Sequence, residues 1–380
     1  MRIAYVINSL EGGGAALPVP SVARVLRDHG AEVAIYALTP RDRRAEAPML
    51  LAGLSVEVRE GREKDHLAAW RWLHQTLSRD RPDVIWTSLT RATLIGQQVG
   101  RSLGVPVVSW QHAAFLKPAN EFLLRSFQAR SGLWVADSIS VGRLTAERLR
   151  VPADRLAVWP IFAADPGAPQ SAPWAAGQPI RVGSLGRLHP VKGYDVLIAA
   201  LARIKDYGFA ALPPFEILIA GDGAERAALE AQIAAARLEN VRLVGFAQAP
   251  KSFLASLHLY VQPSRSEGLC VAVHEAMQAA LPTIVSAVGE LPHSVRHART
   301  GLIVPPEDPT ALAGALYRSL SRPNELARLG QAARTRTLEL FGPEAFASAG
   351  AAVMARLPVA KPPGSGRGRS PIRSVSDRSA

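Results

Sequence analysis

Two glutamates, Glu267 and Glu275, are the side chains whose type and spacing first suggest chemistry. They stand in the segment Pro263-Ser-Arg-Ser-Glu-Gly-Leu-Cys-Val-Ala-Val-His-Glu-Ala-Met277, directly after a run with the composition of a strand. If a helix begins near Gly268, Glu275 lies about two turns further on and on nearly the same side, because an α-helix has 3.6 residues per turn. Both carboxylates can then face one ligand.

The start of this predicted helix is also a candidate anion site. Free backbone amides and the positive end of the helix dipole favour a phosphate there, whereas carboxylates accept hydrogen bonds from sugar hydroxyls. A molecule that carries a phosphate between two sugars satisfies both demands. The alternative is an ordinary helix, with Glu267 exposed and Glu275 on a solvated face. A lone pair of glutamates favours this alternative, and only the surrounding sequence reverses that preference.

Two cations, Arg187 and Lys192, follow another predicted strand in a turn-like stretch that contains Gly186, Pro190 and Gly193. Cations at the carboxyl end of a strand can neutralise a diphosphate in the crevice where wound α/β sheets bind ligands. The alternative is that both are solvated loop charges. The chain contains no Gly-x-x-x-x-Gly-Lys-Ser/Thr sequence, which excludes a Walker-type phosphate loop.

The N-terminal half offers weaker candidates. Gly12, Gly13 and Gly14 follow the first predicted strand and give the backbone freedom for a close approach to a ligand. The alternative is a simple strand-to-helix turn. His112, in Ser109-Trp-Gln-His-Ala113, follows the fourth predicted strand and is either an active-site residue or a hydrogen-bonded loop histidine.

These residues need sheets whose strands end at a common edge. In both halves, short apolar runs alternate with helical patterns, which predicts parallel sheets covered by helices. A helix is expected over Ala224–Arg237, with Asp222 as its cap. The predicted strands are Arg2–Asn8, Val33–Leu38, Asp83–Trp86 and Val105–Trp110 in the N-terminal half, and Ile180–Leu185, Phe215–Ala220, Val241–Leu243, Leu259–Gln262 and Thr283–Ser286 in the C-terminal half.

The chain of 380 residues has the length of two ordinary domains. Residues 163–179 are rich in Pro, Gly and Ala and form the expected linker. This places an N-terminal domain at residues 1–162, a C-terminal domain at 180–357 whose last helix can pack back on the first domain, and a disordered basic tail at 358–380. The expected fold class is α/β, with two Rossmann-like, doubly wound domains that face each other across a cleft.

The composition, 48% hydrophobic and 20% charged, is that of a globular protein. The single cysteine, Cys270, cannot form an intramolecular disulfide, which favours a reducing compartment and hence the cytoplasm. We expect neither a signal peptide nor a membrane-spanning helix, since no apolar run reaches roughly 18 residues. The net charge of +12 suits phosphate groups, nucleic acid or an anionic membrane, but neither aromatic-basic interleaving nor zinc-ligand spacing supports nucleic acid.

The glutamate segment resembles the hallmark of glycosyltransferase family 4, two glutamates separated by seven residues. Other stretches that resemble this family follow in the expected order and cover most of residues 180–316. They are Ser184–Ile198 with its Gly-Arg and Lys-Gly pairs, Ile219–Gly223, Asn240–Phe246 and Thr300–Val304. The resemblance implies the GT-B fold, a nucleotide-sugar donor, retention of the anomeric configuration and no essential metal.

The resemblance also implies roles for single residues. Glu267 contacts the transferred sugar, Glu275 holds the ribose, and His112 approaches the donor sugar and acceptor. The implied reaction moves a sugar to a glycan or lipid-linked acceptor in polysaccharide or glycoconjugate biosynthesis. The remaining implied site residues are Arg187 and Lys192 at the donor diphosphate, Gly186, Gly268, Leu269 and Cys270 around the donor, and Gly12, Gly13 and Gly14 on the acceptor side.

No Asp-x-Asp sequence occurs, so the metal-bridging motif of other glycosyltransferases is absent. Arg187 and Lys192 are then expected to do the metal's work, since fixed cations stabilise the negative charge that moves onto the diphosphate when the sugar–phosphate bond breaks. We expect no metal cofactor.

Several positions depart from the family's pattern. Pro18 and Pro20 fall where the first helix usually runs, so we expect a longer loop after Gly14. A lone cysteine within the glutamate motif is expected to pack rather than react. The other departures are Cys270 and His274 inside that motif, Ile161–Asp165 near the linker, and His293 where a glutamate is common.

Residues 115–130 combine apolar and basic side chains, which is typical of a helix that lies in a membrane interface. This predicts a peripheral association with an anionic membrane, on the inner face of the cytoplasmic membrane. The alternative is an amphipathic helix buried against its own domain. The side chains concerned are Phe115, Leu116, Phe122, Leu123 and Phe127, beside Lys117, Arg125 and Arg130.

Other functions stay open at this point. A GT-B relative with different chemistry, such as a sugar-nucleotide epimerase or a phosphorylase, is one class, although a phosphorylase normally needs a cofactor lysine and a much longer chain. A protein that binds a nucleotide sugar without catalysis, as a scaffold, is another.

Overall fold

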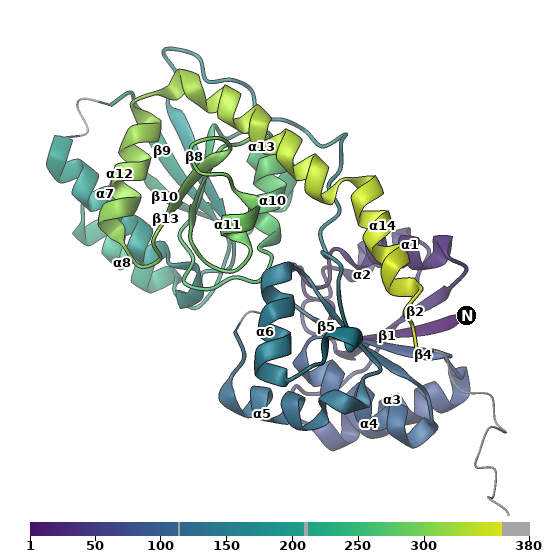
Figure 1. The fold of residues 1–380 in the computed structure, drawn as a ribbon. Helices are drawn as coiled ribbons and strands as arrows, with labels where there is room; N and C mark the ends of the chain where they lie inside the picture. The colour runs from purple at the N-terminus through teal and green to yellow at the C-terminus, as the bar shows by residue number, and fades with distance from the viewer. Residues whose placement is uncertain (113–114, 209–211, 359–380) are drawn as a thin grey trace, which may run out of the picture.

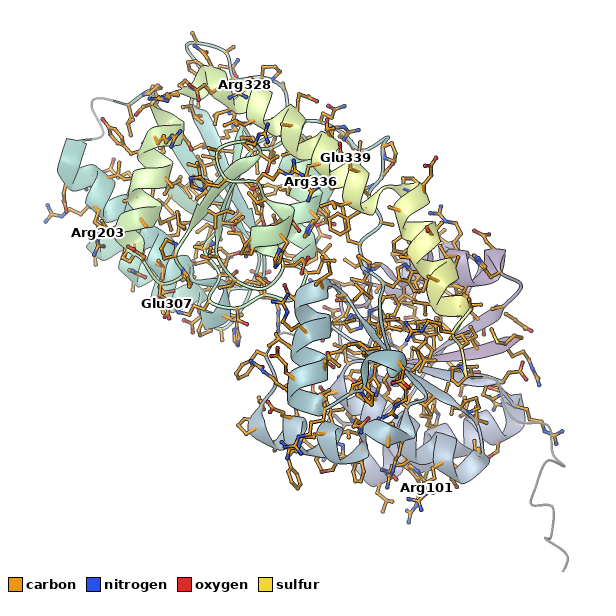
Figure 2. The ribbon with its side chains drawn as sticks, in the orientation of Figure 1. Arg101, Arg203, Glu307, Arg328, Arg336 and Glu339 are labelled. Atoms are coloured by element: carbon orange, nitrogen blue, oxygen red, sulfur yellow. The ribbon has the colours of Figure 1, made fainter. Side chains whose placement is uncertain are left out.

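The computed structural model describes residues 1–112, 115–208 and 212–358. Two parallel sheets with helices on both faces form two domains that follow each other along the chain (Figure 1). The predicted α/β class with two doubly wound domains is therefore confirmed. Charged side chains such as Arg101, Glu307 and Arg328 are exposed and project from the outer surface (Figure 2).

The N-terminal sheet has the strand order β3-β2-β1-β4-β5-β6-β7, and all its strand pairs are parallel. Its central strands are apolar on both faces because helices cover both: Tyr5 packs on the α1 side, whereas Val6 packs on the α3 and α4 side. The strands are β1 (Arg2–Ser9), β2 (Glu32–Thr39), β3 (Ser55–Val58), β4 (Val84–Ser88), β5 (Val107–Gln111), β6 (Leu133–Ala136) and β7 (Leu156–Val158). The described helices are α1 (Val19–Asp28), α2 (Glu46–Leu51), α3 (His66–Asp80), α4 (Thr90–Leu103), α5 (Pro118–Phe127) and α6 (Ile139–Leu149).

The C-terminal sheet has the order β10-β9-β8-β11-β12-β13 and is also parallel throughout. Its strands are β8 (Ile180–Leu185), β9 (Phe215–Ala220), β10 (Val241–Gly245), β11 (Leu259–Gln262), β12 (Thr283–Ser286) and β13 (Gly301–Val304). The described helices are α7 (Tyr194–Gly208), α8 (Arg226–Ala235), α9 (Pro250–Ala255), α10 (Val271–Gln278), α11 (Leu291–Ser294), α12 (Pro309–Leu320), α13 (Leu326–Phe341) and α14 (Pro343–Met354).

Three local expectations need correction. The predicted helix Ala224–Arg237 is shorter, and its cap position is Glu225; the Asp222 carboxylate instead pairs with the Arg226 guanidinium at 3.2 Å. Helix α10 begins at Val271 rather than near Gly268. The short strands β3, β6, β7 and β13 did not stand out as strands in the sequence, because three or four residues are too few to establish a periodic pattern.

The first helix accommodates both of its prolines. Helix α1 begins at Val19, with Pro18 at the cap position and Pro20 in the first turn, where a backbone N–H has no helical partner to lose. The loop between Gly14 and this helix is short and turn-like.

The chain passes between the domains twice. The segment after β7 reaches β8 along the C-terminal domain, and the Asp165 amide donates to Gln278 Oε1 at 2.6 Å on the way. Helix α13 belongs to the C-terminal domain, whereas α14 packs on α1 (Figure 1). Gly350 of α14 allows this approach, since a Cβ there would lie 2.6 Å from the Trp159 ring. The N-terminal domain therefore receives its last helix from the C-terminal end of the described chain.

Both sheets change winding direction at their centre, between β1 and β4 in one and between β8 and β11 in the other. Loops at the carboxyl ends of neighbouring strands meet across the domain boundary: Arg44, in the loop after β2, lies over the Phe246 ring beyond β10 at 3.9 Å. Open α/β sheets bind ligands at such switch points, so this boundary is where a site is expected.

Two sequence expectations concern regions outside this fold. Residues 359–380 of the predicted tail lie outside the described residues. Among the residues that are described, no helix combines the length and the apolar character needed to cross a bilayer.

Candidate active site between the domains

Two loops at the switch point of the C-terminal sheet carry most of the predicted donor residues. One runs from Gly186 to Gly193 after β8, and the other from Pro263 to Cys270 after β11. They touch through their backbones: Gly193 has a φ of +65°, and a Cβ at this position would lie 2.1 Å from the Pro263 carbonyl oxygen. Only glycine fits there, so the sequence itself brings the two loops together.

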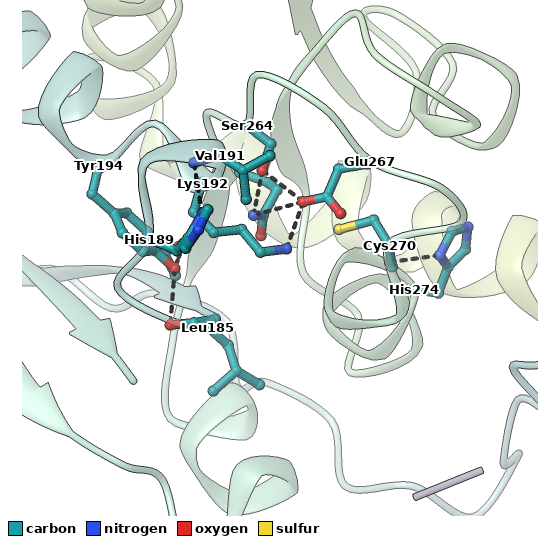
Figure 3. A network of polar contacts seen from close by, with 12 residues as sticks. Leu185, His189, Val191, Lys192, Tyr194, Ser264, Glu267, Cys270 and His274 are labelled. Atoms are coloured by element: carbon teal, nitrogen blue, oxygen red, sulfur yellow. Dashed lines mark hydrogen bonds and ion pairs between the residues drawn. The ribbon is translucent and has the colours of Figure 1, made fainter. Parts of the chain in front are cut away.

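Lys192 and Glu267 form an ion pair where these loops meet, with Nζ 2.6 Å from Oε1 (Figure 3). Ser264 Oγ donates to the same oxygen at 2.6 Å. Burial by itself lowers the pKa of Lys192, but Cys270 and the Glu267 carboxylate raise it overall, so the ammonium stays charged. Lys192 and Glu267, which were predicted from separate sequence motifs, are therefore paired in the structure.

Cys270 and His274, the two residues that depart from the family's pattern inside the glutamate motif, share a hydrogen bond. Cys270 has left-handed backbone geometry with a φ of +63°, and its carbonyl oxygen lies 3.0 Å from His274 Nδ1. Because a carbonyl only accepts, Nδ1 carries the ring proton, and Nε2 accepts from Ser294 Oγ at 2.8 Å. Burial lowers the pKa of His274 to about 4, so the ring is neutral. Burial raises the pKa of the Cys270 thiol, which fits packing rather than reactivity.

Glu275 lies apart from this network. Its carboxylate accepts no hydrogen bond from any group in the described part of the chain. Burial raises its pKa to about 7, with a smaller opposing effect from Lys251. The residue is half-buried, and a carboxylate that is partly withdrawn from water without donors is unfavourable, so a ligand with hydroxyl groups would relieve that cost.

The remaining predicted donor residues lie near the ends of the two loops. Gly186 and Arg187 begin the loop after β8, and Leu269 stands one residue before the end of the loop after β11. Arg187 is exposed, and within the described residues no carboxylate pairs with it. The Gly186 amide donates to the Ala220 carbonyl at 3.0 Å, which fixes the start of its loop. Leu269 is only 2% exposed and packs into the core of the N-terminal domain, so it anchors the glutamate loop across the domain boundary.

His112 lies opposite this loop in the N-terminal domain. Its carbonyl oxygen lies 2.2 Å from where a Cβ on Gly268 would stand, so glycine is required at this contact. Both ring nitrogens are engaged: Nδ1 lies 2.9 Å from Asp137 Oδ1, and Nε2 lies 2.6 Å from Ser88 Oγ. The carboxylate can only accept, so Nδ1 carries a proton, and in a neutral ring Ser88 donates to Nε2. The histidine side chain, which is 8% exposed, lies within a hydrogen-bonded triad.

The loop that contains Gly12, Gly13 and Gly14, after β1, lies beside the boundary between the two domains. The Gly12 amide donates to Asp42 Oδ1 at 3.2 Å, and Gly14 comes within contact distance of Val271, the first residue of α10. None of Gly12, Gly13 and Gly14 has a left-handed φ. The loop therefore serves close approach between domains rather than an unusual turn.

A second contact ties the domains together beside the glutamate loop. Glu290 Oε2 accepts from the Ser140 amide in the first turn of α6 at 3.0 Å, and Ser140 Oγ donates to the Gly289 carbonyl at 3.1 Å. The Glu290 amide donates to the Gly268 carbonyl. A carboxylate at a helix N-terminus is stabilising, so the chain itself supplies the anion for this helix.

Sequence reasoning missed four polar residues of the site: Ser88, Asp137, Gln262 and Ser264. Ser88 and Asp137 lie far from His112 in the sequence and have no spacing signal. Ser264 lies inside the quoted glutamate segment and Gln262 directly precedes it, so their closeness to Glu267 was a usable signal. Among the described residues, no group of His, Cys, Asp and Glu side chains is arranged to hold a metal ion.

Two wound domains with cations and carboxylates at their shared boundary define the GT-B class of sugar-transfer proteins. Models of two families match the chain, "Glycosyl transferases group 1" over residues 170–336 and "Glycosyltransferase Family 4" over residues 12–162. The two matches together span both domains and support glycosyltransferase family 4.

Known relatives agree with this assignment. The amylovoran biosynthesis glycosyltransferase AmsK of Erwinia amylovora is 35% identical over 153 residues, which cover 38% of this chain and 37% of that protein. A D-inositol 3-phosphate glycosyltransferase of Streptomyces scabiei is 36% identical over 177 residues, covering 44% and 39%. The matched stretches thus span less than two fifths of the length of these relatives.

Solved structures share the fold. HepE of Anabaena, in a complex with UDP and glucose, superposes with a TM-score of 0.82 at 20% identity and covers 94% of this chain and 100% of its own. The sucrose-phosphate synthase of Thermosynechococcus elongatus gives a TM-score of 0.75 at 21% identity, covering 93% and 98%. The GT-B fold expected from the sequence is confirmed.

Proposed function

We propose that this chain is a retaining hexosyltransferase that moves a sugar from a nucleoside-diphosphate sugar to a glycan or lipid-linked acceptor. One observation carries the proposal: within the described residues, the C-terminal domain holds an exposed arginine without a carboxylate, Arg187, and a half-buried carboxylate without a hydrogen-bond donor, Glu275. A diphosphate meets the first need and ribose hydroxyls meet the second. The relative that acts in amylovoran biosynthesis points to the same class of product.

The proposed chemistry is leaving-group stabilisation. Cleavage of the sugar–phosphate bond moves negative charge onto the diphosphate, and we assign the stabilisation of that charge to Arg187, Lys192 and the first-turn amides of α10. Glu267 contacts the transferred sugar while Lys192 keeps its carboxylate ionised and oriented. In this proposal the two cations replace a metal ion.

The test begins with binding and ends with products. A thermal-shift panel of UDP-, GDP- and ADP-sugars identifies the donor, because a ligand that binds only the native state raises its melting temperature. Transfer with that donor is then measured with and without a chelator, and NMR of the product gives its anomeric configuration. Binding without turnover would indicate a scaffold, and an altered free nucleotide sugar would indicate an epimerase. Loss of activity with chelator, restored by a divalent ion, would refute metal independence.

Two variants test the roles of the glutamates. Glu275→Ala should weaken the binding of nucleoside diphosphate and nucleotide sugar alike, whereas Glu267→Ala should mainly reduce turnover. Isothermal titration with the nucleoside diphosphate separates the two roles. Equal affinities in the wild type and Glu275→Ala would refute the ribose assignment.

The acceptor is proposed to be reached at a membrane surface through α5. Phe115 and Phe122 are 64% and 68% exposed, and Lys117 and Arg125 lie close to them in the sequence. Leu124, by contrast, is fully buried against the domain. One side of this segment therefore packs on the protein, and the other offers the apolar and basic groups that an anionic bilayer attracts.

The domain division is also kept as a proposal: an acceptor-binding domain at residues 1–162, a linker at 163–179 and a donor-binding domain at 180–357. The separate sheets support it, since β7 ends at Val158 and β8 begins at Ile180. The packing of α14 on α1 means that residues 343–354 complete the first domain in space.

A further inference from the structure

A buried chain of side-chain hydrogen bonds runs from the end of β8 to Glu267. Its members are Tyr260, Gln262 and Ser264, each of which is 0% exposed. Tyr260 and Gln262 occupy alternate positions of β11 and so project from the same face of the strand. Ser264 follows two residues later, and Figure 3 shows its side chain beside the Glu267 carboxylate.

The direction of every bond in this chain is fixed by its ends. The Tyr260 hydroxyl accepts from the Leu185 amide at 3.1 Å and has two acceptors within reach of its proton, Gln262 Oε1 at 2.8 Å and the Leu185 carbonyl at 3.2 Å, of which the nearer is Gln262. The amide oxygen of Gln262 thus faces Tyr260, which leaves Nε2 to donate to Ser264 Oγ at 2.8 Å. Ser264 then donates to Glu267, because an ionised carboxylate only accepts.

The consequence is that Glu267 Oε1 is surrounded by three donors. Ser264 Oγ and Lys192 Nζ each lie 2.6 Å away, and Gln262 Nε2 lies 3.4 Å away. A carboxylate held in this way has one orientation rather than several. Within the described residues, Arg187 and Glu275 form no hydrogen bond with this chain, although the Glu275 charge contributes to the raised pKa of Tyr260. The binding of the nucleotide therefore does not depend on the chain through a direct hydrogen bond.

We propose that Gln262 is a positioning residue for sugar transfer. Through Ser264 it orients Glu267 beside Lys192, and through Tyr260 it ties that orientation to the loop that starts at Gly186. This inference rests on the proposed function, in which Glu267 contacts the transferred sugar and Glu275 holds the nucleotide.

The first test is Gln262→Leu, which removes both amide bonds at nearly constant volume. We expect kcat to fall about 10- to 100-fold, because a small misplacement of a reacting group has this effect. The Kd for the nucleoside diphosphate should stay within about twofold. Ser264→Ala, a smaller change, should lower kcat in the same direction. The matched control is Gln232→Leu, which removes a single bond to the Asp195 carbonyl on the outside of the same domain and should leave kcat unchanged.

A double variant separates positioning from a general loss of structure. In a Glu267→Gln background, Gln262→Leu should cost little further activity, because its effect acts through the carboxylate that is already gone. If the two losses multiply, or if Gln262→Leu turns over like the wild type, the positioning proposal is wrong while the proposed function stands. A wild-type protein that turns over no nucleotide sugar would refute the proposed function, and the positioning proposal with it.

Discussion

The polar groups of the two domains differ in how they are satisfied at their shared boundary. In the N-terminal domain, Ser88, His112 and Asp137 form hydrogen bonds with one another; Ser88 and Asp137 are buried, and the His112 side chain is only 8% exposed. In the C-terminal domain, Arg187 has no carboxylate and Glu275 no donor within the described residues. Groups that the protein leaves unmatched are the ones that a ligand can match. From this comparison we expect the charged part of a ligand to bind the C-terminal domain and the histidine triad to have a supporting role.

The largest effect should come from the unmatched arginine. Arg187→Ala removes a donor to the diphosphate, and the loss of one such transition-state donor typically costs roughly 2.7–4 kcal/mol, or about 10²–10³ in kcat. Steady-state kinetics with the donor identified by thermal shift measures it. Arg328→Ala is the matched control, since Arg328 is also exposed and has no ion-pair partner among the described residues. Equal losses in the two variants would mean that Arg187 is an ordinary surface charge.

Glu275, the carboxylate without a hydrogen-bond donor in the described part of the chain, should lower the free energy of unfolding of the ligand-free protein at neutral pH. Because the folded-state pKa of Glu275 is raised to about 7, the folded state holds its proton more tightly than the unfolded chain, and stability is lost as pH rises from about 4.5 through 7. Glu275→Gln carries no such charge. Relative to the wild type, it should gain roughly 1–3 kcal/mol in the free energy of unfolding between pH 4.5 and pH 8.

Urea unfolding at a series of pH values measures this gain, with the exposed Glu239→Gln as the control. If the difference in the free energy of unfolding between the wild type and Glu275→Gln did not change with pH, the pKa of Glu275 would not be raised in the folded protein. The same variant should bind the nucleoside diphosphate more weakly, so here stability and function oppose each other.

Features that depend on a local residue pattern could be predicted from the sequence, whereas contacts between distant segments could not. The bounds of β8, β9, β11 and β12 were predicted correctly, since buried parallel strands read as continuous apolar runs. Glu267 and Lys192 were found through motif spacing, but their pairing depends on the close approach of Gly193 to Pro263, which spacing does not reveal. The start of α10 was misplaced because the left-handed residue that ends the loop is a cysteine rather than a glycine.

The N-terminal triad was beyond sequence reasoning for a topological reason. Its members stand at or directly after the ends of β4, β5 and β6, which are neighbours in the sheet but are separated along the chain by whole helices. His112 alone was visible, and its partners follow only from the strand order. Residues that topology brings together leave no local pattern.

A supporting role for the triad predicts a smaller effect than that of Arg187. Asp137→Asn keeps the shape but removes the charge that orients His112, so we expect kcat to fall about tenfold, equivalent to about 1.4 kcal/mol, without a change in nucleotide affinity. Kinetics beside isothermal titration measures both quantities, and the exposed Asp154→Asn is the control in the same domain. A loss as large as that of Arg187→Ala would place the histidine in the chemistry itself.

The smallest effect concerns the outer side of α5 and the residues just before it, where Phe115 and Phe122 expose their apolar rings to solvent. If about 40 Å² of the Phe115 or Phe122 ring enters a bilayer, the gain is ~1 kcal/mol, or about fivefold in binding. Flotation with anionic vesicles should show that a protein ending at residue 357 still binds, less at high salt, and that changing both phenylalanines to Ser abolishes binding. Leu51→Ser is the control, since Leu51 is 89% exposed on α2, on the other face of the sheet (Figure 1). If the truncated protein never floats, the tail is the membrane contact, and the exposed phenylalanines must face something other than lipid.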